Sequence, residues 1–202
     1  MANGSVRTVC QDGKCGQITG EQITDSRINK RRNNGSWKNS GVSNGNWWPK
    51  GAIIDYYQDT MQIPNGNIAK WDLIDHKGAA AVVAVREDGK LLMVRQYRNA
   101  LERETLEIPA GGLNGREEPT DQAAMRELQE ETGYHTDHVE LLTSIYTTVA
   151  FCNEKIDIYL ARGLKDRGNQ HLDEDEVIEV EAWELKDLEE MIYTGRSLTA
   201  KQ

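Results

Sequence analysis

The stretch GLNGREEPTDQAAMRELQEETGY, residues 112–134, determines most of what the sequence predicts about this protein. Its second half predicts a helix. Pro119 suits the first turn, Gly133 suits the residue after the last turn, and strong helix formers such as Ala123 and Leu128 lie between them. The residues before Pro119 are rich in glycine and acids, which is typical of a loop.

Three glutamates of this helix lie on one patch of its surface. Glu127, Glu130 and Glu131 have offsets of 0, 3 and 4 residues, so they fall within an arc of roughly 100°. Arg126 comes one turn before Glu130 and can hold it in place. Converging carboxylates repel one another unless a positive charge lies among them, and a hard divalent cation with oxygen ligands is a natural solution. The alternative is an ordinary solvated acidic face, which these letters alone would favour.

The complete spacing favours the first interpretation. Gly112 is followed by five residues, Glu118, seven residues, and then R-E-L-Q-E-E-T-G-Y from Arg126 to Tyr134. This resembles the Nudix box, G-x5-E-x7-R-E-U-x-E-E-x-G-U with U apolar, at every fixed position; Tyr134 occupies a place that is usually aliphatic. The resemblance implies an α/β fold, the Nudix α/β/α sandwich with a mixed sheet. It also implies hydrolysis of a nucleoside diphosphate linked to another group.

The resemblance also implies a metal site and its ligands. The family's metal-binding glutamates fall here on Glu127 and Glu131, with Glu130 as a third candidate, and the expected ion is Mg²⁺, with Mn²⁺ as the alternative. A backbone carbonyl before the helix, that of Ala110 or Gly111, is expected to contribute. Counting from Gly111 overshoots Arg126 by one residue, so either Gly112 is the box glycine or the loop carries a one-residue insertion. We assign catalytic roles to Arg126 and Glu130.

The flanks of the box resemble the ADP-ribose pyrophosphatase branch, in the segments R-Q-Y-R (95–98), L-E-I-P-A-G (106–111) and H-L-D-E-D-E (171–176). This implies that Arg98 and Glu107 contact the substrate and that Glu176 is the base that activates water. Three neighbouring acids could serve instead of Glu176, namely Asp173, Glu174 and Asp175. A proline that this branch usually carries beyond the box is replaced here by Val149.

Two further residues are candidates for substrate contact. Glu154, in F-C-N-E, is expected to help bind the metal or the ribose, by the same resemblance. Trp71 lies with Tyr56 and Tyr57 in a segment through which members of this branch dimerise, and one of these rings could stack on the adenine. An ordinary core or interface aromatic is the plainer interpretation of each ring.

The remaining pattern predicts strands interleaved with two helices, hence a mixed sheet covered by helices. GAAAVVAV is a continuous apolar run, as in a buried strand, and Asp88-Gly89 is a hairpin signal. The last segment, KDLEEMIYTG, predicts an amphipathic helix that ends at Gly195. The expected strands cover residues 52–60, 67–76, 78–85, 91–97, 105–108, 138–149, 154–162 and 176–185.

Charge and composition indicate three regions. The formal net charge is −9, yet the first fifty residues hold eight Lys or Arg against three Asp or Glu. We predict a disordered basic tail over 1–46, because that composition buries too little apolar surface to offset chain entropy. Residues 47–76 are then a strand segment that forms a homodimer, as the resemblance suggests, and residues 77–202 are the Nudix hydrolase domain.

The acidic balance argues against nucleic acid or an anionic membrane as a partner. No apolar run approaches the ~20 residues of a membrane span, and the expected location is the cytoplasm. The leading hypothesis is Mg²⁺-dependent hydrolysis of ADP-ribose and other ADP-sugars, giving AMP and ribose 5-phosphate from ADP-ribose. Another nucleoside diphosphate sugar or a dinucleotide is the nearest alternative. A non-catalytic nucleotide-sensing module is the alternative of another class, but the intact box glutamates favour an enzyme.

Overall fold

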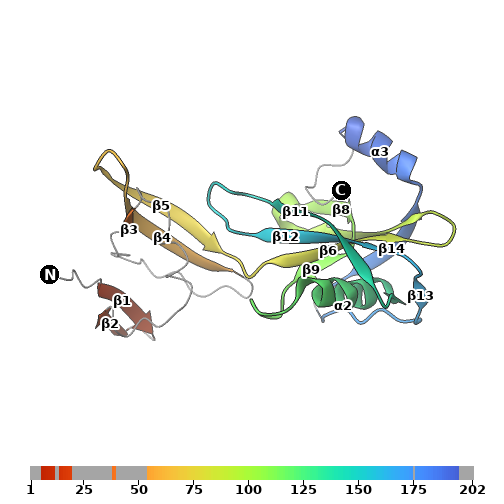
Figure 1. Ribbon diagram of the computed structural model, residues 1–202, viewed down its shortest axis with the longest axis horizontal. Coiled ribbons are helices and arrows are strands. Elements are labelled where there is room, and N and C mark those ends of the chain that lie inside the picture. The colour runs from red at the N-terminus through yellow and green to blue at the C-terminus, as the bar shows by residue number, and fades with distance from the viewer. Residues whose placement is uncertain (1–5, 12–13, 20–37, 40–53, 175, 196–202) are drawn as a thin grey trace. The chain divides into compact units, whose positions relative to one another are not determined.

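The computed structural model describes residues 6–11, 14–19, 38–39, 54–174 and 176–195 (Figure 1). Contacts between Cα atoms divide the chain into two compact units. The first consists of Met1–His76 with Thr148–Asn153, and the second of Lys77–Thr147 with Glu154–Gln202.

The first unit is built on a hairpin of β4 (Asp55–Gln62) and β5 (Ile68–Asp75). These are the two strands expected before the box domain. The short β3 (Lys38–Asn39) pairs with β4, and β1 (Val6–Gln11) pairs with β2 (Lys14–Thr19). In β1, β2 and β3 the structure therefore has paired strands where the sequence indicated disorder. The rest of the expected tail lies outside the described residues, and its disorder stays a prediction.

The segment 148–153 joins this unit although it lies far along the chain. The amide of Ile74 donates to the carbonyl of Phe151 at 2.6 Å, and the amide of Asn153 donates to the carbonyl of Ile74 at 3.3 Å. The side chain of Asn153 accepts from the amide of His76 and donates to Asp75, each at 2.7 Å. Backbone pairing and one amide side chain thus fasten this loop to the end of β5.

The second unit contains a mixed sheet in which β6 (Ala79–Val85) is central. The strand order is β11 (Val139–Tyr146), β12 (Lys155–Ala161), β6, β7 (Leu91–Arg98) and β14 (Ile178–Trp183). The pairing of β12 with β6 is parallel, and the other pairings along this order are antiparallel. The buried run 79–82 is central because both edges of β6 are paired.

The sheet splits where the box loop enters it. β6 pairs with β7 only at Ala84–Leu92 and Val85–Leu91, near their connecting turn. Farther along, β8 (Arg103–Glu107) pairs with β7, and β9 (Ala110–Gly112) pairs with β6. The carbonyl of Pro109, between β8 and β9, accepts the amide of Val82 at 2.8 Å. Segment 103–112 therefore fills the gap between diverging strands and carries the loop to the start of the box helix.

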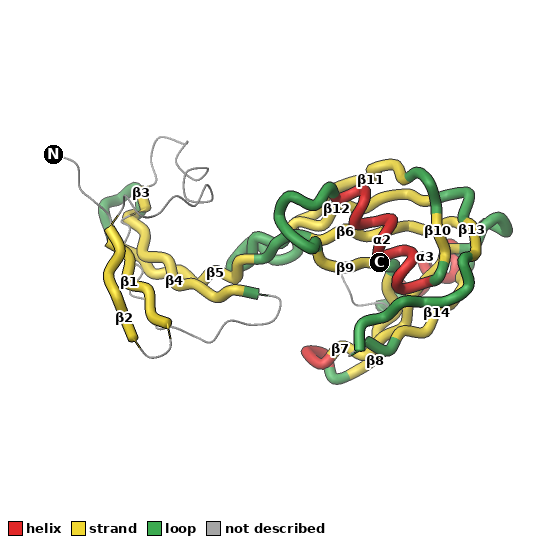
Figure 2. The backbone as a smooth tube through the Cα atoms, turned by 90° about the horizontal axis from the view of Figure 1, so that it is seen from below, coloured by secondary structure: helices red, strands yellow, loops and turns green. Residues whose placement is uncertain are grey.

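Two helices cover opposite faces of this sheet: α2 (Thr120–Thr132) on one and α3 (Leu185–Tyr193) on the other (Figures 1 and 2). The alternation of side chains along β6 explains the two layers. One core cluster unites Ala80 and Val82 of β6 with Leu128 of α2. The other unites Ala79 and Ala81 with Leu188 of α3. The expected mixed sheet between helices is confirmed.

The ends of α2 follow from its flanking residues. Gly133 has φ 75°, and its amide donates to the carbonyl of Gln129, as expected of a glycine that ends a helix. Pro119 is extended, with ψ 130°, so it precedes the helix instead of forming its first turn. Two very short strands, β10 (Tyr134–His135) and β13 (Lys165–Asp166), pair with each other and were not predicted. Among the described residues, no helix is long and apolar enough to cross a membrane.

Candidate active site

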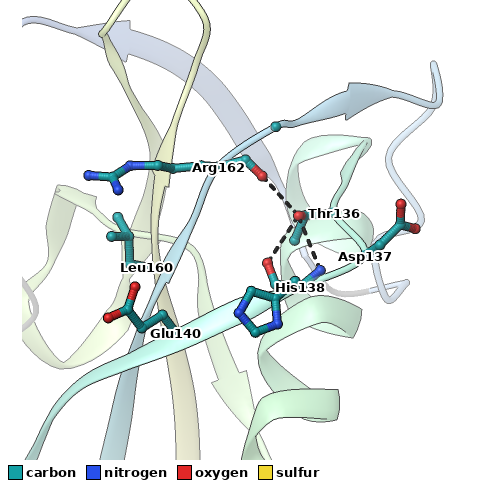
Figure 3. A pocket seen from close by; sticks show the side chains of 7 residues that line it. Thr136, Asp137, His138, Glu140, Leu160 and Arg162 are labelled. Carbon is teal, nitrogen blue, oxygen red and sulfur yellow. Dashed lines mark hydrogen bonds between the residues drawn. The ribbon is translucent and has the colours of Figure 1, made fainter.

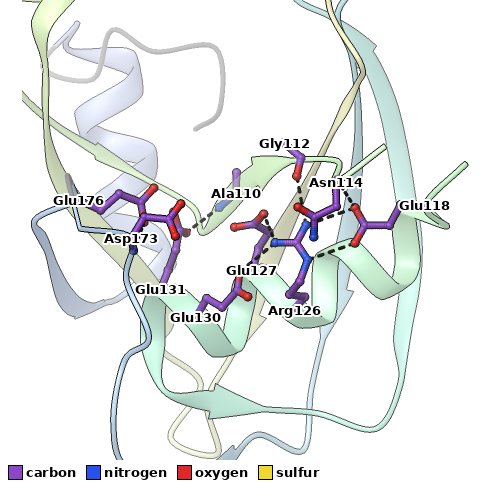
Figure 4. Close-up of polar contacts among 10 residues, drawn as sticks. All are labelled: Ala110, Gly112, Asn114, Glu118, Arg126, Glu127, Glu130, Glu131, Asp173 and Glu176. Atoms are coloured by element: carbon purple, nitrogen blue, oxygen red, sulfur yellow. Dashed lines mark hydrogen bonds and ion pairs between the residues drawn. The ribbon is translucent and has the colours of Figure 1, made fainter. Parts of the chain in front are cut away.

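Arg126 is the hub of the polar cluster on α2 (Figure 4). Its Nη1 donates to Glu127 at 2.6 Å and to Glu130 at 2.9 Å. Its Nε donates to Glu118 at 3.1 Å, and its Nη2 donates to the carbonyl of Gly112 at 3.1 Å. One rigid guanidinium fork therefore connects the helix glutamates to the loop before the helix.

Glu131 and Glu127 also lie against the strand β9, at Ala110 and Gly111. Glu131 is 3% exposed, and its Oε2 accepts the amide of Ala110 at 2.8 Å. A Cβ atom on Gly111 would lie 2.1 Å from the carboxyl carbon of Glu127, whereas a Cβ on Gly112 would meet nothing within 4 Å. Gly111 is therefore the glycine that the site requires. Since Glu118 still reaches Arg126, this geometry favours a one-residue insertion in the loop.

The electrostatics of the patch reflect crowded carboxylates. Burial raises the pKa of Glu127 above its usual value, and the charges of Glu130 and Glu176 raise it further against the opposing ion pair with Arg126. Burial opposes the charge of Arg126, but its bonds to Glu118, Glu127 and Glu130 outweigh burial and raise the pKa of Arg126. The negative charge of the patch is thus compensated only in part by the guanidinium.

The acidic loop 171–177 lies beside the C-terminal end of α2. The amide of His171 donates to the carbonyl of Glu130 at 2.8 Å, and the amide of Arg167 donates to that of Gly133 at 2.9 Å. In Figure 4 the labelled side chains run from Glu118 through Arg126 to Glu131 and Glu176. The structure therefore brings the predicted base into the same region as the glutamates of the box.

Arg98 and Glu107 form a bidentate pair across β7 and β8. Nε and Nη2 of Arg98 each donate to Glu107 at 2.8 Å, and Thr105 donates to the same carboxylate at 2.7 Å. Burial opposes the charge of Arg98, but the bond to Glu107, together with the charges of Glu131 and Glu176, raises its pKa. Glu107 is 3% exposed and Arg98 is about one-third exposed, so the guanidinium is the accessible member of the pair.

Two further predicted substrate residues lie on other elements. Glu154 accepts a hydrogen bond from Thr147 at 2.6 Å, in the segment that enters β12. Trp71 lies on β5 in the first unit and is 47% exposed. The proposed role of each residue stays a prediction.

The carboxylates suit a hard divalent cation in their chemistry, although no cage is preformed. Within residues 54–174 and 176–195, no three His, Cys, Asp or Glu side chains converge on one point that could hold a metal ion. Glu127 and Glu130 are instead directed to Arg126, and Glu131 is directed to the amide of Ala110. The donor oxygens and the uncompensated charge fit Mg²⁺ or Mn²⁺.

The second unit also has two shallow cavities that do not include the acidic patch on α2. One, of about 400 Å³, is bordered by Thr136, His138 and Arg162 at the turns that flank β11 and β12 (Figure 3). The other, of about 430 Å³, is bordered by Thr132, Gln170 and Val180. Neither is lined by Glu127, Glu130 or Glu131.

Sequence reasoning missed two contributors to this site. Thr105 lies two residues before Glu107 and has no motif of its own, although strand alternation could have placed both on one face. Gln170 lies in a loop, where no periodicity marks a buried polar contact. Its amide donates to the carbonyl of Glu131 at 2.5 Å.

Comparison with known proteins agrees with this geometry. A family model described as the NUDIX domain matches residues 75–201. An ADP-ribose pyrophosphatase of Bacillus subtilis is 40% identical over 152 residues, which cover 75% of this chain and 82% of that protein. The chain belongs to the Nudix family. It is a Nudix hydrolase, and the expected dependence of such enzymes on a divalent cation agrees with the acidic patch on α2.

Two further relatives extend the comparison of this Nudix protein. A methanol dehydrogenase activator of Bacillus methanolicus is 38% identical over 158 residues, covering 75% of this chain and 85% of that protein. A crystal structure of an ADP compounds hydrolase superposes with a TM-score of 0.62 at 20% identity, covering 72% of this chain and 78% of that one. The structural likeness confirms the Nudix fold.

Proposed function

We propose that this Nudix hydrolase cleaves the pyrophosphate bond of ADP-ribose and related ADP-sugars, releasing AMP and, from ADP-ribose, ribose 5-phosphate. The observation that carries the proposal is the row of glutamates on α2, held by Arg126 and packed against Gly111. The choice of ADP-ribose is supported by the Bacillus subtilis relative, which is named for this substrate.

We infer that Glu127, Glu130 and Glu131, with a backbone carbonyl of Ala110 or Gly111, hold Mg²⁺, or Mn²⁺ in its place. A bound divalent cation would neutralise pyrophosphate charge and favour the ionised form of water. Arg126 restrains Glu127 and Glu130, so that their carboxylates keep a fixed position on the helix. The hydrogen bond from the amide of Ala110 to Oε2 of Glu131 orients that carboxylate.

Glu176 is proposed to accept the proton of the attacking water. It lies in the loop anchored to the end of α2, and its charge raises the pKa values of both Glu127 and Arg98. The amide of Asp173 donates to Glu176 at 3.3 Å, and Asp173, Glu174 and Asp175 remain the alternative bases.

The substrate is proposed to bind along β7 and β8. Arg98 uses Nε and Nη2 on Glu107, which leaves further N–H groups of its partly exposed guanidinium for an anionic or ribose oxygen. Buried Glu107 serves to orient Arg98 and to contact the substrate. Glu154 is proposed to bind the metal or the ribose, and Trp71 is proposed to stack on the adenine within a homodimer.

The remaining proposals concern macromolecular partners and cellular location. The net charge of −9 is the reason to expect neither nucleic acid nor an anionic membrane as a partner. A cytoplasmic location stays a prediction from the sequence.

A substrate panel tests the proposal. Purified protein with Mg²⁺ is offered ADP-ribose, a GDP-sugar and a nicotinamide dinucleotide, and phosphate is measured after coupling to alkaline phosphatase. The phosphatase releases phosphate from the monoester products but not from an intact pyrophosphate diester. We expect the highest kcat/KM for ADP-ribose. A higher kcat/KM for either other compound would change the substrate assignment but not the proposed pyrophosphate hydrolysis. No phosphate release from any compound would contradict the enzyme proposal.

A further inference from the structure

Most of the described side chains in the loop that carries Glu176 are exposed, and Leu172 is half-buried. His171, Asp173, Glu174 and Glu176 are exposed, and Val177 is 87% exposed. Side chains that remain in solvent cannot fix a backbone by packing, so the position of the loop depends on hydrogen bonds, both those within it between Asp173 and Glu176 and those at its two ends.

Gln170 donates one hydrogen bond to α2 and one to the residue that follows the loop. Its Nε2 donates to the carbonyl of Glu131 at 2.5 Å and to the carbonyl of Ile178 at 3.2 Å. Gln170 directly precedes the loop, and Ile178 is the first residue of β14, which follows it. One carboxamide therefore joins the start of the loop, its end and the helix that carries the box glutamates.

The carbonyl of Glu131 is available for this bond because of its place in α2. The last four carbonyls of a helix have no partner within the helix, and residues 129–132 end α2. The neighbouring carbonyl of Glu130 is taken by the amide of His171 at 2.8 Å. The loop thus caps the very residues whose side chains form the acidic patch.

We propose that Gln170 is a positioning residue for hydrolysis, which acts by holding Glu176 at a fixed place relative to Glu127 and Glu131. The inference rests on the proposed function, in which Glu176 accepts the proton of the attacking water. A shift of the base by about 1 Å is enough to cost on the order of 100-fold in rate, so a hydrogen bond remote from the reacting atoms can affect turnover.

The test is a double-mutant cycle of Gln170→Met and Glu176→Gln in the full-length protein. Methionine preserves the length and approximate volume of the side chain but donates no hydrogen bond, and the adjoining cavity of about 430 Å³ gives it room. Gln122→Met, at an exposed position near the start of α2, is the matched control. Each protein is assayed with the substrate that the wild type hydrolyses fastest, and its Tm is measured.

We expect Gln170→Met to lower kcat roughly 10- to 100-fold, with little change in KM and a Tm within about 5 °C of the wild type. Glu176→Gln should lower kcat about 100-fold or more. The double variant should be no slower than Glu176→Gln alone, because the position of residue 176 no longer matters once its side chain cannot act as the base. Gln122→Met should resemble the wild type.

Three results would overturn the inference, in two distinguishable ways. If Glu176→Gln lowers kcat but Gln170→Met does not, or if their effects add fully in the double variant, Gln170 has no role through Glu176. If Glu176→Gln retains wild-type kcat, the proposed base is wrong, and the inference falls with it.

Discussion

At the scale of single residues, the site depends on the absence of a side chain at Gly111. Gly111 leaves room for the carboxylate of Glu127, which burial has already made costly to ionise. In the observed position Glu127 both accepts from Nη1 of Arg126 and occupies the space where a Cβ of residue 111 would lie. The smallest residue of the loop therefore determines where a glutamate of the helix lies.

Gly111→Ala should therefore abolish most turnover while leaving the protein folded. The added Cβ would be 2.1 Å from the Glu127 carboxyl carbon, which must move away. We expect kcat/KM to fall about 100-fold or more, measured by phosphate release, with native circular dichroism. Gly115→Ala, where a Cβ meets nothing within 4 Å, is the control. Equal activity of the two variants would contradict the role of Gly111.

At the scale of elements, the sequence predicted what depends on local pattern. The run 79–85 and the end of α2 at Gly133 follow from apolar continuity and from glycine's tolerance of positive φ. The split of the sheet by 103–112 was not predicted, because it depends on how β6 and β7 diverge in space. The bond of Gln170 to α2 was missed for a similar reason, since loop sequence carries no periodic signal.

The sequence predicted those residues of the site that belong to the family motif. The box spacing led to the cluster around Arg126, whereas its counted glycine, Gly112, is not the residue that lies against Glu127. A one-residue insertion shifts a count without changing the contacts that matter, so only the structure distinguishes the two glycines.

The start of α2 is fastened to β12 through Asp157. Its carboxylate accepts bonds from Thr120 at 2.9 Å, Ser144 at 2.5 Å and Lys155 at 2.6 Å. Burial opposes ionisation, but these three donors outweigh it and hold the pKa of Asp157 below its usual value. A lowered folded-state pKa stabilises the protein above the unfolded pKa, about 3.9, and this stabilisation is lost as pH falls through the folded value.

Asp157→Asn should therefore destabilise the protein in a pH-dependent way. At about pH 7 we expect a loss of about 1–2 kcal/mol in the free energy of unfolding, because the bonds lose their charged acceptor. The difference from wild type should shrink at a second, acidic pH below the lowered folded-state pKa of Asp157, where the native carboxyl is protonated as well. Urea denaturation at both pH values measures it, and a difference independent of pH would refute the assignment.

At the scale of the whole molecule, the chain is divided into units that are not continuous in sequence. Residues 148–153 leave the second unit and pair with the end of β5, which no local pattern indicated. Val149, where the related branch usually has proline, lies in this segment and is 79% exposed. The backbone bonds of Ile74 to this segment are made with Phe151 and Asn153 and do not involve Val149.

The hairpin of the first unit carries apolar surface that suits association with a second copy. Ile68 is 61% exposed, Trp71 47% and Tyr56 41%. Strand alternation puts Tyr56 and Ile68 on one face of the hairpin and Trp71 on the other, so both faces present exposed apolar groups, which are typical of an interface. We expect light scattering to give about twice the chain mass of 22.8 kDa, and Ile68→Ser with Trp71→Ser to shift the protein towards the single-chain mass. A single-chain mass for the wild type at all concentrations would contradict the homodimer.

The most direct test of the whole account is the product yield of the wild type and Glu131→Gln with ADP-ribose and Mg²⁺. Glutamine can still accept the amide of Ala110, now 2.8 Å from Glu131 Oε2, so the fold is kept while one ligand charge is lost. Glu189→Gln, at an exposed position of α3, is the control. We predict that the wild type and the control each release AMP and ribose 5-phosphate in equal amounts. The rate of release by Glu131→Gln should be lower by about 1,000-fold. Wild-type turnover in that variant, or intact ADP-ribose after incubation with the wild type, would contradict the account.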